Sequence, residues 1–246
     1  AFIHVKNLSD LEYVQNHYLI FATKDGLMKK TTLESYSRPR ANGIIALGLR
    51  EGDRLIRVTL TDGNSQMLVA SYNGKVVRFP EDTVRPMGRT ASGVRAIKLD
   101  EDGKDCVVGM ICVEEGSKDT VLVISDKGYG KRTLLDDENG EPIYRITNRG
   151  GKGVKTMNLT DKTGNLIGLE AVNDEQDLML ITKSGTAIRM AMTSISTLGR
   201  ATQGVKLIEL QKRNDTLMFG CVVPKEEAEE QAAEEVSTEE TTITEE

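Results

Sequence analysis

Cations recur at a fixed distance from turn glycines in four stretches of the chain, a pairing that suits an anionic partner. In each stretch a short apolar run ends at a glycine, and a Lys or Arg follows four residues later. The four pairs are Gly26 with Lys30, Gly74 with Arg78, Gly128 with Arg132 and Gly185 with Arg189. Glycine lets a backbone approach a phosphate group closely, and an adjacent cation supplies the charge. A polymer with regularly spaced phosphates, such as duplex DNA, is the partner that this repetition favours.

A second glycine closes each unit after a link that is rich in glycine and basic residues. The closing glycines, each followed by Ile or Val, are Gly43, Gly93, Gly153 and Gly204. Three links carry an arginine four residues before this glycine and a further cation two residues after it. The first link instead places Arg38 and Arg40 around Pro39. We predict a DNA-binding set that comprises Lys29, Lys30, Arg38, Arg40, Arg78, Arg89, Arg95, Lys131, Arg132, Arg149, Lys152, Lys155, Arg189, Arg200 and Lys206.

A structural interpretation of the same residues stays open. Glycines also serve tight turns, and cations protect strand edges from pairing with other chains. Recurrence of a cation at the same place in every unit favours a common binding surface over this alternative.

The elements that must position these residues are short β-strands. The four apolar runs are too short for helices and rich in β-formers; they are residues 18–23, 66–71, 120–125 and 177–182. Asp25-Gly26 and Asn73-Gly74 favour type I′ hairpin turns. Return strands, third strands such as 94–99 and 205–210, and fourth strands such as 107–113 complete each unit. The repetition predicts an all-β, propeller-like array of four-stranded blades.

Three segments depart from this repeat. An acidic insertion at residues 136–142 interrupts the third copy, as a solvent loop would. Residues 2–8 resemble the fourth strand of a preceding blade. The chain also begins at Ala1 without an initiator methionine, and we therefore expect it to be part of a longer protein. We expect the blades to occupy residues 1–223.

The net charge of −6 conceals a separation of charge along the chain. Residues 224–246 hold ten Glu and one Lys, a net charge of −9, which leaves +3 on residues 1–223. A Glu-rich segment with few large apolar side chains cannot bury enough surface to offset its ordering entropy. We expect a disordered acidic tail, which either keeps the protein soluble or competes with a polyanion for the basic body.

Several classes of function lack their residues. No phosphate-binding loop ends in Gly-Lys-Ser/Thr, His4 and His17 stand isolated, and no tyrosine has the context of a DNA-cleaving residue. We therefore expect no catalytic centre, metal or cofactor on this chain. An odd number of cysteines without CxxC spacing indicates reduced cytosolic thiols. No apolar run approaches the length of a membrane span, and no secretory signal is visible.

Three motifs together resemble one known family. Residues 128–133 read Gly-Tyr-Gly-Lys-Arg-Thr, residues 84–90 read Val-Arg-Pro-Met-Gly-Arg-Thr, and residues 199–205 read Gly-Arg-Ala-Thr-Gln-Gly-Val. They closely resemble the C-terminal domain of bacterial DNA gyrase A subunits, and the resemblance covers residues 1–223. It implies a β-pinwheel, in which blades exchange a strand with their neighbours, and duplex DNA wrapped around a basic rim.

The resemblance also implies a cellular setting. DNA gyrase is an ATP-dependent type II topoisomerase that introduces negative supercoils. Its A subunits and B subunits form an A2B2 holoenzyme, and the DNA-cleaving tyrosine belongs to the N-terminal part of the A subunit. The expected partners are therefore duplex DNA, that N-terminal part and the B subunit, and the expected location is the cytoplasm, at the nucleoid.

The hallmark box of the family is degenerate here. The box is a Gln followed by two basic residues, two glycines, a basic residue and a glycine. Residues 147–153 keep Arg149, Gly150, Gly151, Lys152 and Gly153 but begin with Thr147 and Asn148. We expect a complete box upstream of Ala1. Two alternatives remain open, namely the equivalent domain of topoisomerase IV and a propeller that scaffolds proteins, for which aromatic hot spots would be expected.

Overall fold

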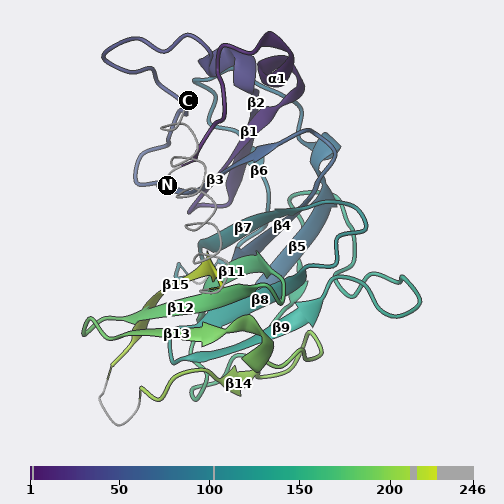
Figure 1. Cartoon of the computed structure of the whole chain (residues 1–246), viewed down its shortest axis with the longest axis vertical. Coiled ribbons are helices and arrows are strands. Elements are labelled where there is room, and N and C mark those ends of the chain that lie inside the picture. The colour runs from purple at the N-terminus through teal and green to yellow at the C-terminus, as the bar shows by residue number, and fades with distance from the viewer. Residues whose placement is uncertain (2, 102, 211–214, 226–246) are drawn as a thin grey trace, which may run out of the picture.

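Four small antiparallel sheets follow one another along the chain (Figure 1). A computed structural model describes residues 1, 3–101, 103–210 and 215–225. Each sheet forms one blade, and the fold is all-β with short helical turns, as the repeat predicts. The first blade, in purple, lies at one end of the molecule, and the fourth, in green, lies at the other end (Figure 1).

Each blade is built on a meander of three consecutive strands. Blade 1 contains β1 (Tyr18–Thr23), β2 (Leu27–Thr32) and β3 (Leu55–Thr61). Blade 2 contains β4 (Gln66–Ser71), β5 (Lys75–Pro80) and β7 (Val107–Val113). Blade 3 contains β8 (Thr120–Ser125), β9 (Tyr129–Leu134) and β11 (Leu166–Val172). Blade 4 contains β12 (Gln176–Thr182), β13 (Ala187–Ala191) and β15 (Leu217–Pro224).

The turn glycines behave as their sequence context predicts. Gly26, Gly74, Gly128 and Gly185 all take positive φ, between 76° and 87°. In each turn the glycine N–H donates to the last residue of the preceding strand, as from Gly26 to the Thr23 carbonyl at 3.2 Å. The four hairpins are thus equivalent, and this prediction is confirmed.

A short fourth strand is exchanged between neighbours. The sheet orders are β3-β1-β2-β6, β10-β5-β4-β7 and β11-β8-β9-β14. The exchanged strands are β6 (Val94–Arg95), β10 (Val154–Lys155) and β14 (Val205–Lys206). Each comes from the link of the following unit and pairs with the return strand of the blade before it. Repeat periodicity alone places this strand in its own blade, whereas the structure shows the exchange that the family resemblance implies.

The closing glycines make the exchange sterically possible. A Cβ on Gly93 would lie 2.4 Å from the Met28 carbonyl oxygen, and one on Gly153 would lie 2.5 Å from that of Val76. Both residues take positive φ. Gly43 has the same backbone conformation, but a Cβ there would meet nothing within 4 Å. In the described part of the chain, the first link therefore has no return strand against it.

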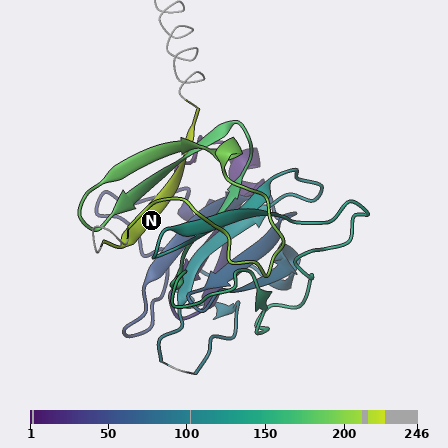
Figure 2. The same cartoon turned by 90° about the horizontal axis from the view of Figure 1, so that it is seen from below.

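The hydrophobic core lies between the blades. Alternate residues of one strand face opposite neighbours, so that Met67 and Val69 pack toward blade 1 while Leu68 packs toward blade 3. The inner strands β3, β7, β11 and β15 contact one another in sequence along the axis. There the Arg57 guanidinium makes two hydrogen bonds of 2.9 Å to the Glu170 carboxylate. Figure 2 shows the fourth blade against the others from below.

The remaining elements are short. They are the helix α1 (Leu11–Asn16) and the 3₁₀ turns η1 (Leu33–Tyr36), η2 (Glu81–Thr83) and η3 (Met192–Ser194). Within the described ranges no helix is long and apolar enough to cross a bilayer. Residues 3–8 form no strand, and Ile3, Val5 and Leu8 pack instead on the outer face of blade 1. This expectation is therefore corrected, because the segment covers a blade and does not extend a sheet.

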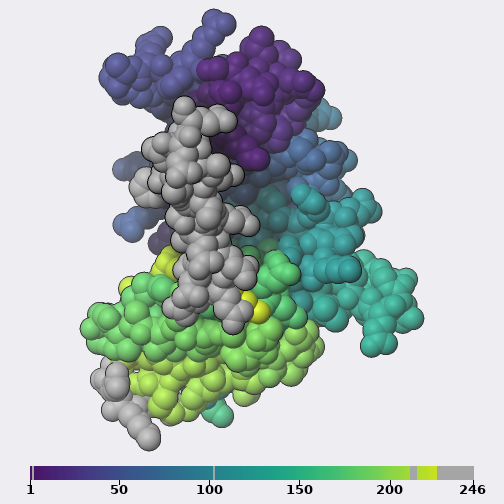
Figure 3. All heavy atoms as spheres, viewed as in Figure 1, coloured from purple at the N-terminus to yellow at the C-terminus, as the bar shows by residue number. Residues whose placement is uncertain are grey.

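Two further expectations concern the surface and the tail. The acidic insertion forms an exposed loop beyond the end of β9, closed by an antiparallel bridge between Asp136 and Pro142 (Figures 1 and 3). The final strand runs to Pro224, one residue beyond the expected boundary. The expected disordered tail lies outside the described residues from residue 226 onward.

Candidate nucleic-acid interface

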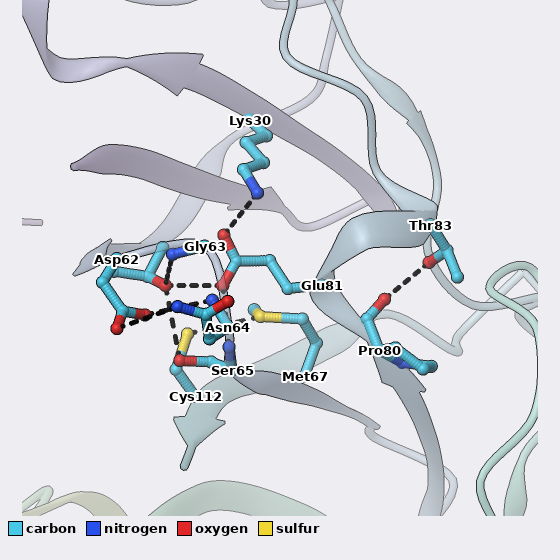
Figure 4. Close-up of polar contacts among 11 residues, drawn as sticks. Lys30, Asp62, Gly63, Asn64, Ser65, Met67, Pro80, Glu81, Thr83 and Cys112 are labelled. Atoms are coloured by element: carbon cyan, nitrogen blue, oxygen red, sulfur yellow. Dashed lines mark hydrogen bonds and ion pairs between the residues drawn. The ribbon is translucent and has the colours of Figure 1, made fainter. Parts of the chain in front are cut away.

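The cation that follows each turn glycine forms an ion pair, and in three blades that pair joins neighbouring blades. In blade 1 the Lys30 ammonium lies 2.7 Å from the Glu81 carboxylate of blade 2 (Figure 4). Their side chains are 6% and 0% exposed. The same carboxylate accepts hydrogen bonds from the Thr61 hydroxyl at 2.5 Å and the Ser65 N–H at 3.2 Å. The Lys30 ammonium also lies 4.1 Å from the centre of the Tyr18 ring.

The arginines of blades 2 and 3 reach the following blade in the same way. Arg78 pairs with Asp136 at 2.7 Å and donates to the Leu135 carbonyl at 3.1 Å. Arg132 pairs with Asp174 at 2.7 Å and donates to the Met192 carbonyl at 3.0 Å. Both arginine side chains are buried.

The fourth cation stays within its own blade. Arg189 pairs with Asp177 of the adjacent strand at 2.8 Å and donates to the Pro224 carbonyl at 2.6 Å. It therefore ties β13 to β15 across β12.

Two lysines fill the space beneath the links. Lys29 is fully buried and donates to the carbonyls of Ala46 and Arg89, both at 2.5 Å. Lys131 is also fully buried and donates to the carbonyls of Gly199 and Arg200, at 2.5 and 2.6 Å. Burial, assisted by the nearby arginine of each link, lowers the pKa of both lysines to about 8.

These contacts change the role of the most periodic residues. A cation that is buried and bonded to protein oxygens is withheld from a phosphate on an external ligand. We therefore correct the predicted set by assigning to the fold Lys29, Lys30, Arg78, Lys131 and Arg132. These five residues therefore have a structural role, as the alternative interpretation of the repeat allowed. They act through ion pairs and contacts with carbonyl groups, and not by protecting strand edges.

The link arginines are neither buried nor fully exposed. Arg89 donates to the Ile45 carbonyl at 3.2 Å, Arg149 donates to the Arg95 carbonyl at 3.3 Å, and Arg200 donates to the Lys155 carbonyl. Each acceptor stands two residues after the closing glycine of the preceding link. All three guanidinium groups are half-buried, so they hold successive links together while part of each remains at the surface.

Six predicted cations are exposed. Three of them, one on each exchanged strand, are Arg95, Lys155 and Lys206. The exchanged strands form the outer edges of blades 1 to 3, because the inner strands occupy the opposite edge of each sheet. The other three belong to links; they are Arg38, Arg40 and Lys152.

Two exposed arginines at the starts of links were not in the predicted set. Arg85 follows the buried Val84, and Arg145 follows the buried Tyr144. The sequence could have indicated them by their shared position, because each follows directly after a buried apolar or aromatic residue at the start of its link. The first and fourth units have Ser37 and Ser196 there, so the position does not carry a cation in every copy.

Together the fold and its outer edge define a class of protein: a propeller-like repeat with exchanged strands and a row of exposed cations around its outside. Comparison with known proteins gives the family. Four successive segments match the DNA gyrase C-terminal domain, β-propeller family, over residues 17–62, 66–114, 119–173 and 176–219. The chain therefore belongs to this family.

Similar proteins agree with the match. The chain is 44% identical over 231 residues to the DNA gyrase A subunit of Staphylococcus aureus strain MRSA252, covering 94% of this chain and 25% of that protein. It is 43% identical over 228 residues to the same protein of strain NCTC 8325, covering 93% and 24%. The chain thus spans about a quarter of the length of these relatives.

Solved structures establish the fold. A DNA gyrase A C-terminal domain matches with a TM-score of 0.71 at 23% identity, covering 85% of this chain and 66% of that one. The C-terminal domain of a DNA topoisomerase IV matches with a TM-score of 0.76 at 22% identity, covering 85% and 62%. The fold is therefore common to both enzymes, whereas the relatives at 43–44% identity are gyrase A subunits.

Proposed function

We propose that this chain binds duplex DNA without sequence preference and bends it around the outer edges of the blades. The observation that carries the proposal is the exposed cation at the same place on three exchanged strands, at Arg95, Lys155 and Lys206. Contacts to phosphates fix the path of a duplex and carry no base information. The link cation Lys152 lies just before the exchanged strand β10. Arg38 and Arg40 lie in the corresponding link of the first unit.

Bending sets the energy that these contacts must exceed. Smooth bending of a 20–30 bp site costs on the order of 1–6 kcal/mol on elastic estimates. A single surface contact is too weak to supply this, so several phosphates must be bound together. Exposed and half-buried cations that recur from blade to blade meet this requirement, because a curved array presents them in succession to one continuous backbone.

In the longer protein we assign the chain a role in negative supercoiling by DNA gyrase. A wrap of fixed handedness would present a second segment of the same duplex to the strand-passage machinery, so ATP-driven passage would change linking number in one direction. The partners are then the B subunit of gyrase, together with the remainder of the A subunit, in an A2B2 holoenzyme at the bacterial nucleoid. Membership of the gyrase A family supports this assignment.

A salt titration tests the binding mode. If about six phosphates are neutralised, affinity for a random-sequence duplex should fall on the order of a thousandfold between 50 and 200 mM salt. Binding isotherms with two unrelated duplexes measure this. A flat salt response, or a strong preference for one sequence, would contradict phosphate-driven binding.

Ligation of a nicked plasmid in the presence of the protein tests wrapping itself. The expected result is a shift in linking number of one sign that grows with the protein-to-DNA ratio. The triple variant Arg95→Gln, Lys155→Gln, Lys206→Gln should lose this shift while it keeps the unfolding midpoint of the parent. If the parent chain binds DNA but does not change its linking number, the chain has a DNA-binding surface and the proposed wrapping is contradicted.

A further inference from the structure

A groove opens on the outer edge of blade 2, where the degenerate box crosses β5. Val76 and Val77 of β5 form one wall, and the other is formed by the link residues Arg145, Thr147, Asn148, Gly151, Lys152, Gly153 and Val154. Its lining contains two exposed cations, Arg145 and Lys152, and no carboxylate. We call this cavity the β5 groove.

The groove exists because two positions differ from those of the neighbouring blades. The pairings of Val94 with Met28, Val154 with Val76 and Val205 with Gly130 align the three exchanged strands. By this register Val77 takes the place of the buried lysines of blades 1 and 3. Those lysines, Lys29 and Lys131, fill the space beneath their links and bond to link carbonyls.

The second difference lies in the link itself. Gly151 stands where the neighbouring links carry Ala91 and Thr202. The nearest atoms to a Cβ built on Gly151 are the Asn148 carbonyl oxygen at 3.7 Å and a Val77 methyl carbon at 3.9 Å. Both distances are ordinary contacts, so the site has room for a methyl group that the chain does not supply. A shorter side chain on the β5 wall, Val77 in place of lysine, and a missing side chain on the link wall, at Gly151, leave the groove open.

The cations of the groove are free for a ligand. Among the described residues neither the Arg145 guanidinium nor the Lys152 ammonium has a hydrogen bond or an ion pair. Arg149, by contrast, is bonded to the carbonyls of Thr83 and Arg95. Two unpaired cations beside glycine backbone favour an anion with several oxygen acceptors.

We propose that the β5 groove seats one phosphate of the duplex and so fixes the register of the DNA on this part of the rim. The inference rests on the proposed function, because it assigns the ligand as a phosphodiester of bound DNA. Other rim cations meet phosphates as point charges on an open surface. The groove differs in surrounding a single phosphate from three sides, by Arg145, by Lys152 and by the bare backbone of Gly151 and Gly153.

Gly151→Ala tests the proposal without removing a charge. The added methyl enters the groove without steric overlap, so the fold should be unchanged and affinity for a random duplex should fall three- to tenfold. The salt slope should drop by about 0.9, the value for one lost phosphate contact. Gly88→Ala is the matched control, because it adds a methyl to the preceding link where a Cβ meets nothing within 4 Å. Equal affinities for the two variants would overturn the proposal.

Arg145→Gln and Arg85→Gln provide a second pair. Both remove an exposed arginine at the start of a link, but only Arg145 lines the groove. In a double-mutant cycle, Arg145→Gln should add little to Gly151→Ala, because both act on one phosphate, whereas Arg85→Gln should add its full effect. Additive effects of Arg145→Gln and Gly151→Ala would contradict a shared site.

Amide chemical shifts separate the sources of the anion. Addition of a short duplex to the parent chain should shift the N–H signals of Gly151 and Gly153, and Gly151→Ala should reduce the shift of Gly153. Shifts with inorganic phosphate alone and none with duplex would overturn the proposal in favour of a free-anion site. Failure of the parent to bind duplex at all would instead refute the proposed function, so the two failures are distinguishable.

Discussion

The Lys30 ammonium is buried between blades 1 and 2, and the Glu81 carboxylate compensates its charge. Both side chains are nearly inaccessible, and the Thr61 hydroxyl and the Ser65 N–H also donate to the carboxylate. Removal of one partner from such a pair leaves an uncompensated charge, which is costlier than the pair itself is stabilising.

We therefore predict that Lys30→Met lowers the free energy of unfolding by about 3–5 kcal/mol. The double variant Lys30→Met, Glu81→Gln should recover much of this loss, because no charge remains buried. Urea unfolding followed by circular dichroism measures both. Lys98→Met, which breaks a surface pair with Glu101, is the control and should change little. A similar small effect for Lys30→Met would show that the pair is not buried in solution.

The lysines beneath the links predict an unusual pH dependence. Burial lowers the pKa of Lys29 and Lys131 from 10.5 to about 8. Between pH 8 and pH 10.5 the unfolded chain therefore binds protons that the folded protein has released, and stability rises with pH. The rise should reach about 1.4 kcal/mol per pH unit for each group at most. The measurement is the free energy of unfolding at pH 7.5, 8.5 and 9.5.

The control is a chain in which both lysines are methionine. An apolar residue is acceptable at this position, because Val77 and Ile188 occupy it in blades 2 and 4. The difference between parent and double variant should change in favour of the parent as pH rises from 8 to 10. Parallel curves would show that the two lysines keep the same protonation state on folding.

The repeated positions could be predicted from the sequence, but the roles of the residues at these positions could be predicted less well. Lys30, Arg78 and Arg132 are periodic because every blade must be joined to the next one, and a DNA contact would produce the same period. Burial separates the two interpretations, and burial depends on a partner such as Asp174 that lies at no fixed distance in sequence. The exposure of Arg95 and Lys155 could be predicted because both residues lie on strands that form an edge of a sheet.

At the scale of elements, strand exchange depends on glycines that have neither a Cβ nor a preference for negative φ. Gly153 crosses the Val76 carbonyl so closely that any side chain would overlap it. Gly43 has nearly the same φ, +79° against +73°, but no neighbour within 4 Å. A substitution at Gly43 therefore adds only backbone strain, whereas a substitution at Gly153 adds both backbone strain and a steric overlap.

We predict that Gly43→Ala costs about 1–2 kcal/mol, the strain of a left-handed residue alone. Gly153→Ala should cost more, because β10 must also move away from β5. Urea unfolding gives the energies, and hydrogen exchange of the Thr156 amide, which donates to the Gly74 carbonyl at 2.8 Å, reports whether β10 stays docked. Equal costs for the two substitutions would contradict the exchange.

The strands themselves were predictable from local patterns, whereas the exchange of strands between blades followed only from the family resemblance. Apolar runs and Asp-Gly or Asn-Gly turns define these strands locally, and the observed bounds of β1 and β4 are the expected ones. The third strands were expected to be six residues long and contain only two, because the receiving strands β2 and β5 begin at Leu27 and Lys75, the partners of Arg95 and Lys155. Pairing between blades is long-range, and repeat periodicity is unchanged when every unit passes a strand to its neighbour.

At the scale of the whole molecule, residues 1–223 and residues 224–246 carry net charges of opposite sign. Exposed cations lie on the outer edges of the blades, whereas the last 21 residues contain all ten glutamates of the C-terminal segment. The structure also shows how much of the C-terminal segment can be removed without disrupting blade 4. Pro224 pairs with Gln176 and accepts a hydrogen bond from Arg189, so residues up to Pro224 belong with blade 4.

We predict that a chain ending at Lys225 binds duplex DNA more tightly than the parent at low salt, because ten carboxylates no longer compete with phosphate for the outer edges. The gain should shrink as salt rises, since exposed charges more than about 10 Å apart are largely screened at 0.1 M. Isotherms at 50 and 200 mM salt measure both effects. A parent-length chain with all ten tail glutamates changed to glutamine separates charge from bulk: it should match the truncated chain. If it matches the parent instead, the tail acts through its volume, and if truncation has no effect at low salt, the tail does not compete with DNA.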